Sequence, residues 1–149
     1  MSKILTILPG KCIKCGTCEA VCPNSGVDVI HFEEVEISVP VMCMQCEDAA
    51  CMNVCPKGAI SRDENGAVLP DPKKCIACKM CVIACPFGNI SFSVAKNQIM
   101  KCNLCGGDPQ CAKYCPTQAI QYVTGTTANI DKKKIIAEKF KQLFAEVKS

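Results

Sequence analysis

The sequence has no tryptophan, two tyrosines, five phenylalanines and a single histidine among its 149 residues. With so few bulky aromatic side chains, we expect something other than side chains to fill part of the interior. The histidine, His31, lies beside acids in VIHFEEVE, which is typical of a surface residue. A glycine-rich phosphate loop and a G-x-G-x-x-G fingerprint are also missing. These absences argue against a catalytic domain and against nucleotide binding.

Long apolar segments and targeting signals are scarce as well. No segment approaches the roughly 20 apolar residues of a membrane-spanning helix. The first residues, MSKILTILPGKC, have neither the apolar length nor the cleavage site of a secretory signal. Nucleic acid is an unexpected partner, because the basic residues are not interleaved with stacking aromatics. We therefore expect a cytoplasmic protein with no membrane span.

The net charge of +3 hides an asymmetry between the two halves of the chain. Residues 1–74 carry seven Lys+Arg against ten Asp+Glu, whereas residues 75–149 carry ten against four. Such a distribution fits either a solvated surface or docking faces of opposite sign for protein partners.

Cysteine, in contrast, is abundant, with sixteen residues in four similar runs that each end in Cys-Pro. The runs are Cys12, Cys15, Cys18 and Cys22; Cys43, Cys46, Cys51 and Cys55; Cys75, Cys78, Cys81 and Cys85; Cys102, Cys105, Cys111 and Cys115. Eight disulfides are not expected in a reducing cytoplasm, so the thiols are predicted to bind metal. An apolar, strand-like piece follows each run: SGVDVI, KGAI, FGNISF and TQAIQYV.

The spacing C-x2-C-x2-C-x3-C-P is the bacterial ferredoxin pattern for [4Fe–4S] clusters, in which the fourth cysteine ligates the other cluster of a pair. The third and fourth cysteines are four residues apart, which predicts a short helix that presents both on one face. Proline then ends the turn and leads into the strand. Zinc is the competing metal, although zinc ribbons use two separated C-x2-C pairs.

The segment between the second and third runs indicates which runs share clusters. AIS and AVL flank RDENG there, and Asn65-Gly66 is a hairpin signal. This connection favours pairing the second run with the third, which leaves the first for the fourth. ILTIL before the first run and AIQYV after the fourth are expected to close that second pair. Sequential pairing, first with second and third with fourth, is the alternative.

CMQCEDAACMNVCPKGAI, CIACKMCVIACPFGNI and KCNLCGGDPQCAKYCPTQAI resemble the four-cluster ferredoxin-type electron-transfer subunits of molybdenum and tungsten oxidoreductases, hydrogenases and carbon monoxide dehydrogenases. The resemblance covers about residues 3–123. Within this group the compact fourth run is most similar to the small subunit of tungsten-containing aldehyde oxidoreductases. The resemblance implies four [4Fe–4S] clusters held in a nested scheme. Their ligand sets are Cys12, Cys15, Cys18 and Cys115; Cys22, Cys102, Cys105 and Cys111; Cys43, Cys46, Cys51 and Cys85; Cys55, Cys75, Cys78 and Cys81.

The expected fold is α+β, with two pseudo-symmetric bacterial-ferredoxin-like lobes within residues 1–123. Lobe one comprises 1–30 and 100–123, and lobe two comprises 40–95. Four lysines near the runs would favour the reduced state of a nearby cluster, although each also fits a solvated surface: Lys14, Lys79, Lys101 and Lys113.

Residues 124–149 are predicted to form a linker and a C-terminal amphipathic helix with Asp131 as N-cap. Its apolar stripe is Ile136, Phe140, Leu143, Phe144 and Val147, with Lys132, Lys133, Lys139 and Lys141 mostly on the other side. The helix either packs over its own lobes or docks on a catalytic subunit or a neighbouring copy. Lying on a membrane is the least favoured option.

The predicted function is non-catalytic electron transfer through four clusters, between a catalytic tungsten or molybdenum subunit and a second redox protein. A tungsten aldehyde oxidoreductase is the expected partner. The same role for a hydrogenase, formate dehydrogenase or carbon monoxide dehydrogenase is one alternative. A zinc-binding interaction module is an alternative of another class.

Overall fold

The computed structural model describes residues 3–35, 37–125, 133–134, 136–138 and 140–141. Its elements are short and include both α-helices and β-strands, which is consistent with the predicted α+β class. In order they are β1 (Lys3–Ile7), η1 (Pro9–Lys11), α1 (Thr17–Ala20), β2 (Val27–Phe32), η2 (Glu33–Val35), β3 (Ile37–Met42), α2 (Ala50–Asn53), β4 (Ile60–Arg62), β5 (Val68–Pro70), α3 (Met80–Ala84), β6 (Ile90–Ser93), β7 (Gln98–Lys101), η3 (Leu104–Gly107), α4 (Gln110–Lys113) and β8 (Ile120–Thr124).

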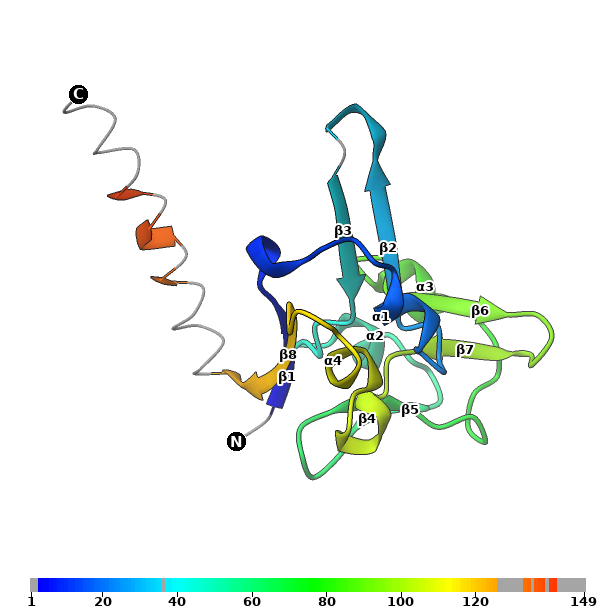
Figure 1. Cartoon of the computed structure of the whole chain (residues 1–149). Helices are drawn as coiled ribbons and strands as arrows, with labels where there is room; N and C mark the ends of the chain where they lie inside the picture. Colours follow the sequence, from blue (N-terminus) through cyan, green and yellow to red (C-terminus); the bar gives the residue numbers. More distant parts are fainter. Residues whose placement is uncertain (1–2, 36, 126–132, 135, 139, 142–149) are drawn as a thin grey trace.

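In the described residues, four two-stranded antiparallel ribbons surround the helices α1 to α4, which lie near the centre of the cysteine-rich part (Figure 1). The ribbons are β1–β8, β2–β3, β4–β5 and β6–β7. The first of these joins the two ends of the cysteine-rich region, because Lys3 pairs with Thr124 and Ile7 with Ile120. This is the pairing expected for ILTIL and AIQYV.

The strands after the Cys-Pro pairs also form where expected. β2, β4, β6 and β8 each begin four residues after the proline of their run. The hairpin predicted at Asn65-Gly66 joins β4 to β5, and Asp63 closes its turn by accepting from the backbone N–H groups of Asn65 and Ala67. The hairpin brings the second run close to the third, in agreement with the proposed connection.

The short helix predicted to carry the third and fourth cysteines of each run needs one correction. The third cysteine is the second residue of its helix in every run: Cys18 in α1, Cys51 in α2, Cys81 in α3 and Cys111 in α4. The fourth cysteine lies after the helix, not within it. The cause is the following proline, which disfavours the α conformation at the residue before it; Cys85, for example, is extended, with φ −71° and ψ 113°.

Apolar side chains gather in two cores that both contain cysteines. The first core comprises Leu5, Val27, Met42, Cys43, Ala67, Cys102, Leu104, Cys111 and Ile120. The second core comprises Ala49, Cys51, Ile60, Val68, Cys81, Ile90 and Ile99. The buried residues of the described part of the chain include no aromatic side chain. Five thiols lie among the buried apolar residues instead: Cys43, Cys51, Cys81, Cys102 and Cys111.

The C-terminal segment is described only in part. Residues 133–134, 136–138 and 140–141 are helical, and Ile136 and Phe140 are exposed. Lys141 pairs with Glu138 at 3.3 Å. Asp131, Lys132, Lys139, Leu143, Phe144 and Val147, which complete the predicted helix, lie outside the described residues. Within the described residues, no helix is both long and apolar enough to cross a membrane.

Candidate cluster-binding sites

The sixteen cysteines are all free thiols that fall into four groups, each drawn from two runs. Three groups line separate cavities: Cys12, Cys15, Cys18 and Cys115; Cys43, Cys46, Cys51 and Cys85; Cys55, Cys75, Cys78 and Cys81. We call these the Cys12, Cys43 and Cys75 sites. The remaining four, Cys22, Cys102, Cys105 and Cys111, form the Cys102 site.

The thiols of the Cys102 site lie close enough together for a thiolate charge on one of them to raise the pKa of another. Burial raises the pKa of Cys111 to about 12, and the charges of Cys102, Cys22 and Cys105 add to this shift. Burial likewise raises the pKa of Cys102 to about 11, with further contributions from Cys43 and Cys22. Cys102 is thus electrostatically coupled to its own group and to Cys43 of the neighbouring site.

A left-handed residue precedes the second cysteine of every run. These residues are Lys14, Gln45, Ala77 and Leu104, with φ between 49° and 62°. None is glycine, and such a conformation costs about 1–2 kcal/mol for an L-residue. Consecutive right- and left-handed residues turn backbone N–H groups into one concavity, which is a common cradle for anionic groups such as iron–sulfur clusters. The loops therefore fit the anionic cofactor that the cysteine spacing predicts.

A second left-handed residue follows the fourth cysteine by three positions in every run. These residues are Ser25, Gly58, Gly88 and Gln118, with φ between 47° and 67°. The turn directs the next backbone N–H at the sulfur: Gly26 donates to Cys22 Sγ and Ala59 to Cys55 Sγ, both at 3.2 Å. We did not predict this feature, because glycine marks it in only two of the four runs.

Gly26 holds two runs together at the Cys102 site. A Cβ atom at Gly26 would lie 2.8 Å from Cys102 Cα and 3.0 Å from its backbone nitrogen. A methyl group therefore does not fit without a shift of the backbone. The glycine allows the turn after Cys22 to approach the first cysteine of the fourth run.

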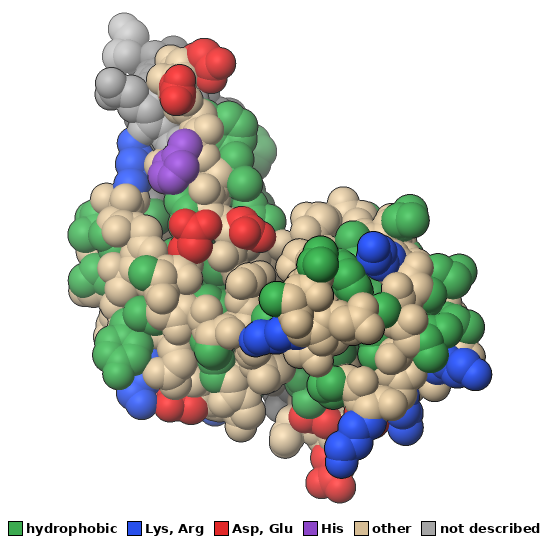
Figure 2. All heavy atoms as spheres, turned by 90° about the vertical axis from the view of Figure 1, so that its right-hand side faces the viewer, with side chains coloured by type: hydrophobic (Ala, Val, Ile, Leu, Met, Phe, Trp, Pro, Cys, Tyr) green, Lys and Arg blue, Asp and Glu red, His purple; other side chains and the backbone are tan. Residues whose placement is uncertain are grey.

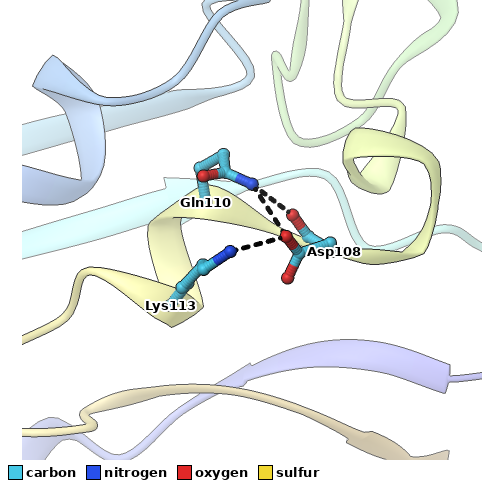
Figure 3. A network of polar contacts seen from close by, with 3 residues as sticks. All are labelled: Asp108, Gln110 and Lys113. Atoms are coloured by element: carbon cyan, nitrogen blue, oxygen red, sulfur yellow. Dashed lines mark hydrogen bonds and ion pairs between the residues drawn. The ribbon is translucent and has the colours of Figure 1, made fainter.

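The five-residue spacing between Cys105 and Cys111 is stabilised by local polar contacts (Figure 3). Asp108 Oδ2 accepts from Lys113 Nζ at 2.9 Å and from Gln110 Nε2 at 3.2 Å. Gln110 Nε2 also donates to the Asp108 carbonyl at 2.8 Å. The Lys113 ammonium lowers the pKa of Asp108 by a hydrogen bond and by its charge. Lys113 therefore stabilises the loop between Cys105 and Cys111 through its ion pair with Asp108.

The other lysines that the sequence singled out differ in their surroundings. Lys14 and Lys79 are exposed side chains at the mouths of the Cys12 and Cys75 sites. Lys79 Nζ lies 4.4 Å from the centre of the Phe92 ring. Lys101, in contrast, is buried and lines the Cys43 site. His31 is exposed and contacts Ser38, as expected of a surface histidine.

Within the described residues, the side chains do not form a ready site for a single metal ion. Zinc binds thiolates at about 2.3 Å, so four zinc ligands must lie close together. No three His, Cys, Asp or Glu side chains in the described residues are arranged to hold one metal ion. A cubane, in contrast, takes its four thiolates at four separate irons.

Comparisons with known proteins agree with this assignment. Residues 35–125 and residues 4–56 each match the 4Fe-4S dicluster domain. The polyferredoxin-like subunit of an aliphatic sulfonate oxidoreductase from Pyrococcus furiosus is 37% identical over 134 residues, which span 81% of this chain and 78% of that protein. The electron transport protein HydN of Escherichia coli is 37% identical, over 80% of this chain and 87% of its own length.

A third relative is the thiosulfate reductase electron transfer subunit PhsB of Salmonella typhi. It is 35% identical over 75% of this chain and 70% of its own length. Two dicluster matches and sixteen cysteines account for four [4Fe–4S] clusters per chain.

Proposed function

The chain belongs to the 4Fe-4S dicluster family of ferredoxin-type electron-transfer proteins, and on this premise we propose that it relays electrons between the catalytic subunit of an oxidoreductase and a second redox partner. Its homologues are electron-transfer subunits of larger complexes. When bound, each [4Fe–4S] cluster takes up or releases one electron. The residues of the chain hold the clusters, exclude water and set the order in which they are reached.

We assign one cluster to each of the four cysteine groups, which is the nested scheme. The observation that supports it is the lining of the three cavities, each of which receives three cysteines from one run and the fourth from its partner run. Sequential pairing would need Cys22 beside the second run and Cys55 beside the first. The two matched family regions overlap at residues 35–56 and do not bear on the pairing.

We propose that the groups form two lobes. Lobe one (1–30 and 100–123) is supported by the β1–β8 pairing and by contacts of α1 with α4. Lobe two (40–95) is supported by the β4–β5 hairpin and by contacts of α2 with α3. Met42, Cys43 and Ala67 of lobe two also enter the first core, so the lobes share apolar contacts.

These contacts support a linear order of sites. Cys18 of the Cys12 site and Cys111 of the Cys102 site lie on the contacting helices α1 and α4. Cys51 of the Cys43 site and Cys81 of the Cys75 site lie on α2 and α3. Cys43 and Cys102 lie in the same apolar core, which joins the lobes. The order is therefore Cys12, Cys102, Cys43 and Cys75; we call the first and last outer sites and the other two inner sites.

The exposure of the cysteines is the observation that best supports a relay function. Of the sixteen cysteines, which all lie within the described residues, only Cys15 and Cys78 are exposed. They belong to the two outer sites, so electrons have one entry and one exit that solvent-facing partners can approach. The inner sites have no exposed cysteine.

The surface around Cys78 is suited to a protein partner. Ile76, Met80 and Ile83 are exposed nearby in sequence, and Ile83 reaches 86% exposure. Lys57 and Lys79 line the same site. On the face shown in Figure 2, basic and exposed apolar side chains lie on both parts of the molecule, and acidic side chains lie at the upper left and along the lower edge. An acidic redox partner with an apolar contact patch fits this end.

We propose a tungsten-dependent aldehyde oxidoreductase as the catalytic partner, in the cytoplasm. The proposal rests on the compact fourth run and on homologues that are subunits of oxidoreductases. We further propose that the C-terminal segment docks on that subunit or on a second copy through its apolar stripe, of which Ile136 and Phe140 are exposed. Removal of residues 125–149 should then weaken assembly, and unchanged complex size would contradict this docking.

The test is to isolate the native complex without oxygen, with this chain as bait, and to analyse its metals. We expect about 16 iron and 16 sulfide per chain, after correction for the partner's own clusters. We expect the complex to contain tungsten. We also expect an aldehyde to reduce the clusters and so to bleach their visible absorption. Nickel would instead assign the chain to a hydrogenase or carbon monoxide dehydrogenase. A complex whose substrates never reduce the clusters of this chain would contradict the relay.

A further inference from the structure

Lys101 is the last residue of β7 and lies between the two inner sites. Its side chain is only 2% exposed. Nζ lies 3.1 Å from Cys43 Sγ, 2.6 Å from the Val68 carbonyl and 3.4 Å from the Cys102 carbonyl. An ammonium group has three N–H donors, and these three acceptors match them. The side chain is therefore held in one place, against one thiol of the Cys43 site and the backbone of the Cys102 site.

Among the described residues, no carboxylate forms an ion pair with Lys101. It is the only charged side chain among the buried residues of the described chain. The two ion pairs of that part of the chain involve Lys113 and Lys141. A buried cation needs a compensating negative charge. With clusters bound, the thiolate ligands of the inner sites would supply it, and Cys43 Sγ is in direct contact with Nζ.

We propose that Lys101 sets the potential of the inner sites: its fixed positive charge makes the cluster at the Cys43 site, and to a smaller extent that at the Cys102 site, easier to reduce than the clusters at the outer sites. This inference rests on the proposed ligand sets. Reduction adds negative charge, so a nearby cation stabilises the reduced form. Hydrogen bonds to the ligand sulfurs and nearby charge are general determinants of cluster potentials.

Burial distinguishes Lys101 from the lysines at the outer sites. Lys14 and Lys79 are exposed, so water and salt screen their charges. Lys101 acts from within the protein, where an interaction between charges is several times stronger than at the surface. The consequence is that electrons collect in the middle of the relay, while the outer sites exchange them with partners.

The direct test is a redox titration of the cluster-loaded chain, followed by electron paramagnetic resonance, with a chemical reductant and mediators. In Lys101→Gln, which keeps a donor but loses the charge, we expect the reduced-to-oxidised ratio of one inner cluster to fall about tenfold at a fixed potential. For a one-electron couple that is a midpoint about 59 mV lower. Lys101→Arg, which keeps the charge, should stay near the wild type. Lys96→Gln, which removes an exposed charge from the β6–β7 turn, is the matched control.

A Lys101→Gln protein with full iron content and four unchanged midpoints would overturn the proposal. A second measurement applies even if that variant loses iron. In chains with Cys15→Ser or Cys78→Ser, the transition at the highest potential should persist, because it belongs to an inner cluster. Its shift or loss in either variant would overturn the proposal. Since the reductant is chemical, these results do not depend on whether a catalytic partner delivers electrons, which the native complex tests separately.

Discussion

Cys102 and Cys111 of one inner site are buried, as are Cys43 and Cys51 of the other, whereas each outer site exposes one cysteine, Cys15 or Cys78. The acidity of the thiols varies within the sites as well, because burial also raises the pKa of Cys18 and of the buried Cys81 at the outer sites. Burial raises the pKa of Cys102 to about 11. A hydrogen bond from Thr17 Oγ1, 3.2 Å from the sulfur, lowers the pKa of Cys15. One cysteine motif thus occurs in two environments within a single short chain.

This difference separates what the motif determines from what the fold adds. All four runs share the left-handed residue before their second cysteine and the left-handed residue after their fourth. The backbone cradle is therefore common to inner and outer sites. Burial, by contrast, depends on where each run lies relative to the other lobe. The cysteine motif therefore accounts for cluster binding at all four sites. The place of each site in the fold decides whether it passes electrons within the chain or exchanges them with a partner.

The largest expected effect is the loss of an inner ligand. In Cys51→Ser, a buried thiol that serves the Cys43 site is replaced by a hydroxyl, and we expect the loss of one cluster, or about 4 iron per chain. A buried unsatisfied hydroxyl also costs about 1–3 kcal/mol of unfolding free energy. Iron analysis and thermal unfolding under argon measure both effects. Cys78→Ser at the exposed outer position should retain the folded structure, and equal destabilisation by the two variants would remove the distinction between inner and outer sites.

A steric change at an inner site should have the next largest effect. Gly26→Ala places a methyl group within 2.8–3.0 Å of Cys102 atoms, including its backbone. Overpacking of this kind costs about 1–3 kcal/mol, and it should lower cluster occupancy at the Cys102 site. Unfolding by denaturant and iron content provide the readouts. Gly10→Ala, where nothing lies within 4 Å of the added atom, is the control; the interpretation fails if both variants behave alike.

Charge reversal at an outer site should change association with the partner and leave the fold intact. Lys57→Glu together with Lys79→Glu removes two positive charges from the mouth of the Cys75 site. For an acidic partner we expect the association rate to fall roughly tenfold at low salt, with a smaller difference at high salt. Stopped-flow mixing of the two proteins measures it. A faster rate would mean that the partner at this end is basic.

The smallest expected effect concerns the acidity of free thiols. In the metal-free chain the reactive species is the thiolate. The lowered pKa of Cys15 gives it more thiolate near pH 8 than Cys102 or Cys111, whose pKa values of about 11 and 12 keep them protonated. Alkylation followed by mass spectrometry should therefore label Cys15 first, and labelling of Cys102 should rise only as the pH approaches 11.

Thr17→Val removes the hydrogen bond to Cys15 and should slow labelling of that thiol severalfold. The exposure of Cys15 to solvent is unchanged by this variant, so access alone does not produce the effect. If Thr17→Val labels as fast as the wild type, exposure and not acidity explains the reactivity of Cys15.

The sequence predicts much of this structure because the cysteine motif constrains the chain locally. Pro23, Pro56, Pro86 and Pro116 mark the ends of the four runs, and strands begin four residues after each. The hairpin at Asn65-Gly66 and the β1–β8 pairing were also predictable, the first from its turn residues and the second from the remaining apolar segments. The long β2–β3 ribbon was not foreseen, because no turn motif marks its bend at Glu33–Val35.

Features that depend on long-range contacts were not predictable. The sequence singled out four lysines, and only the structure distinguishes buried Lys101 from Lys113, which pairs with Asp108. Gln118 and Ser25 occupy the same left-handed position as Gly58 and Gly88. Because only two of the four residues are glycine, the sequence does not reveal that this turn occurs in every run. The requirement for glycine at position 26 arises from Cys102, which is 76 positions further along the chain.

The most direct test of the account is a crystal structure of the cluster-loaded chain, with the irons located by their anomalous scattering. We predict four [4Fe–4S] clusters in the order Cys12, Cys102, Cys43 and Cys75 sites, each ligated by three cysteines of one run and the fourth cysteine of its partner run. Clusters shared between the first and second runs, or single metal ions at the four sites, would contradict the account.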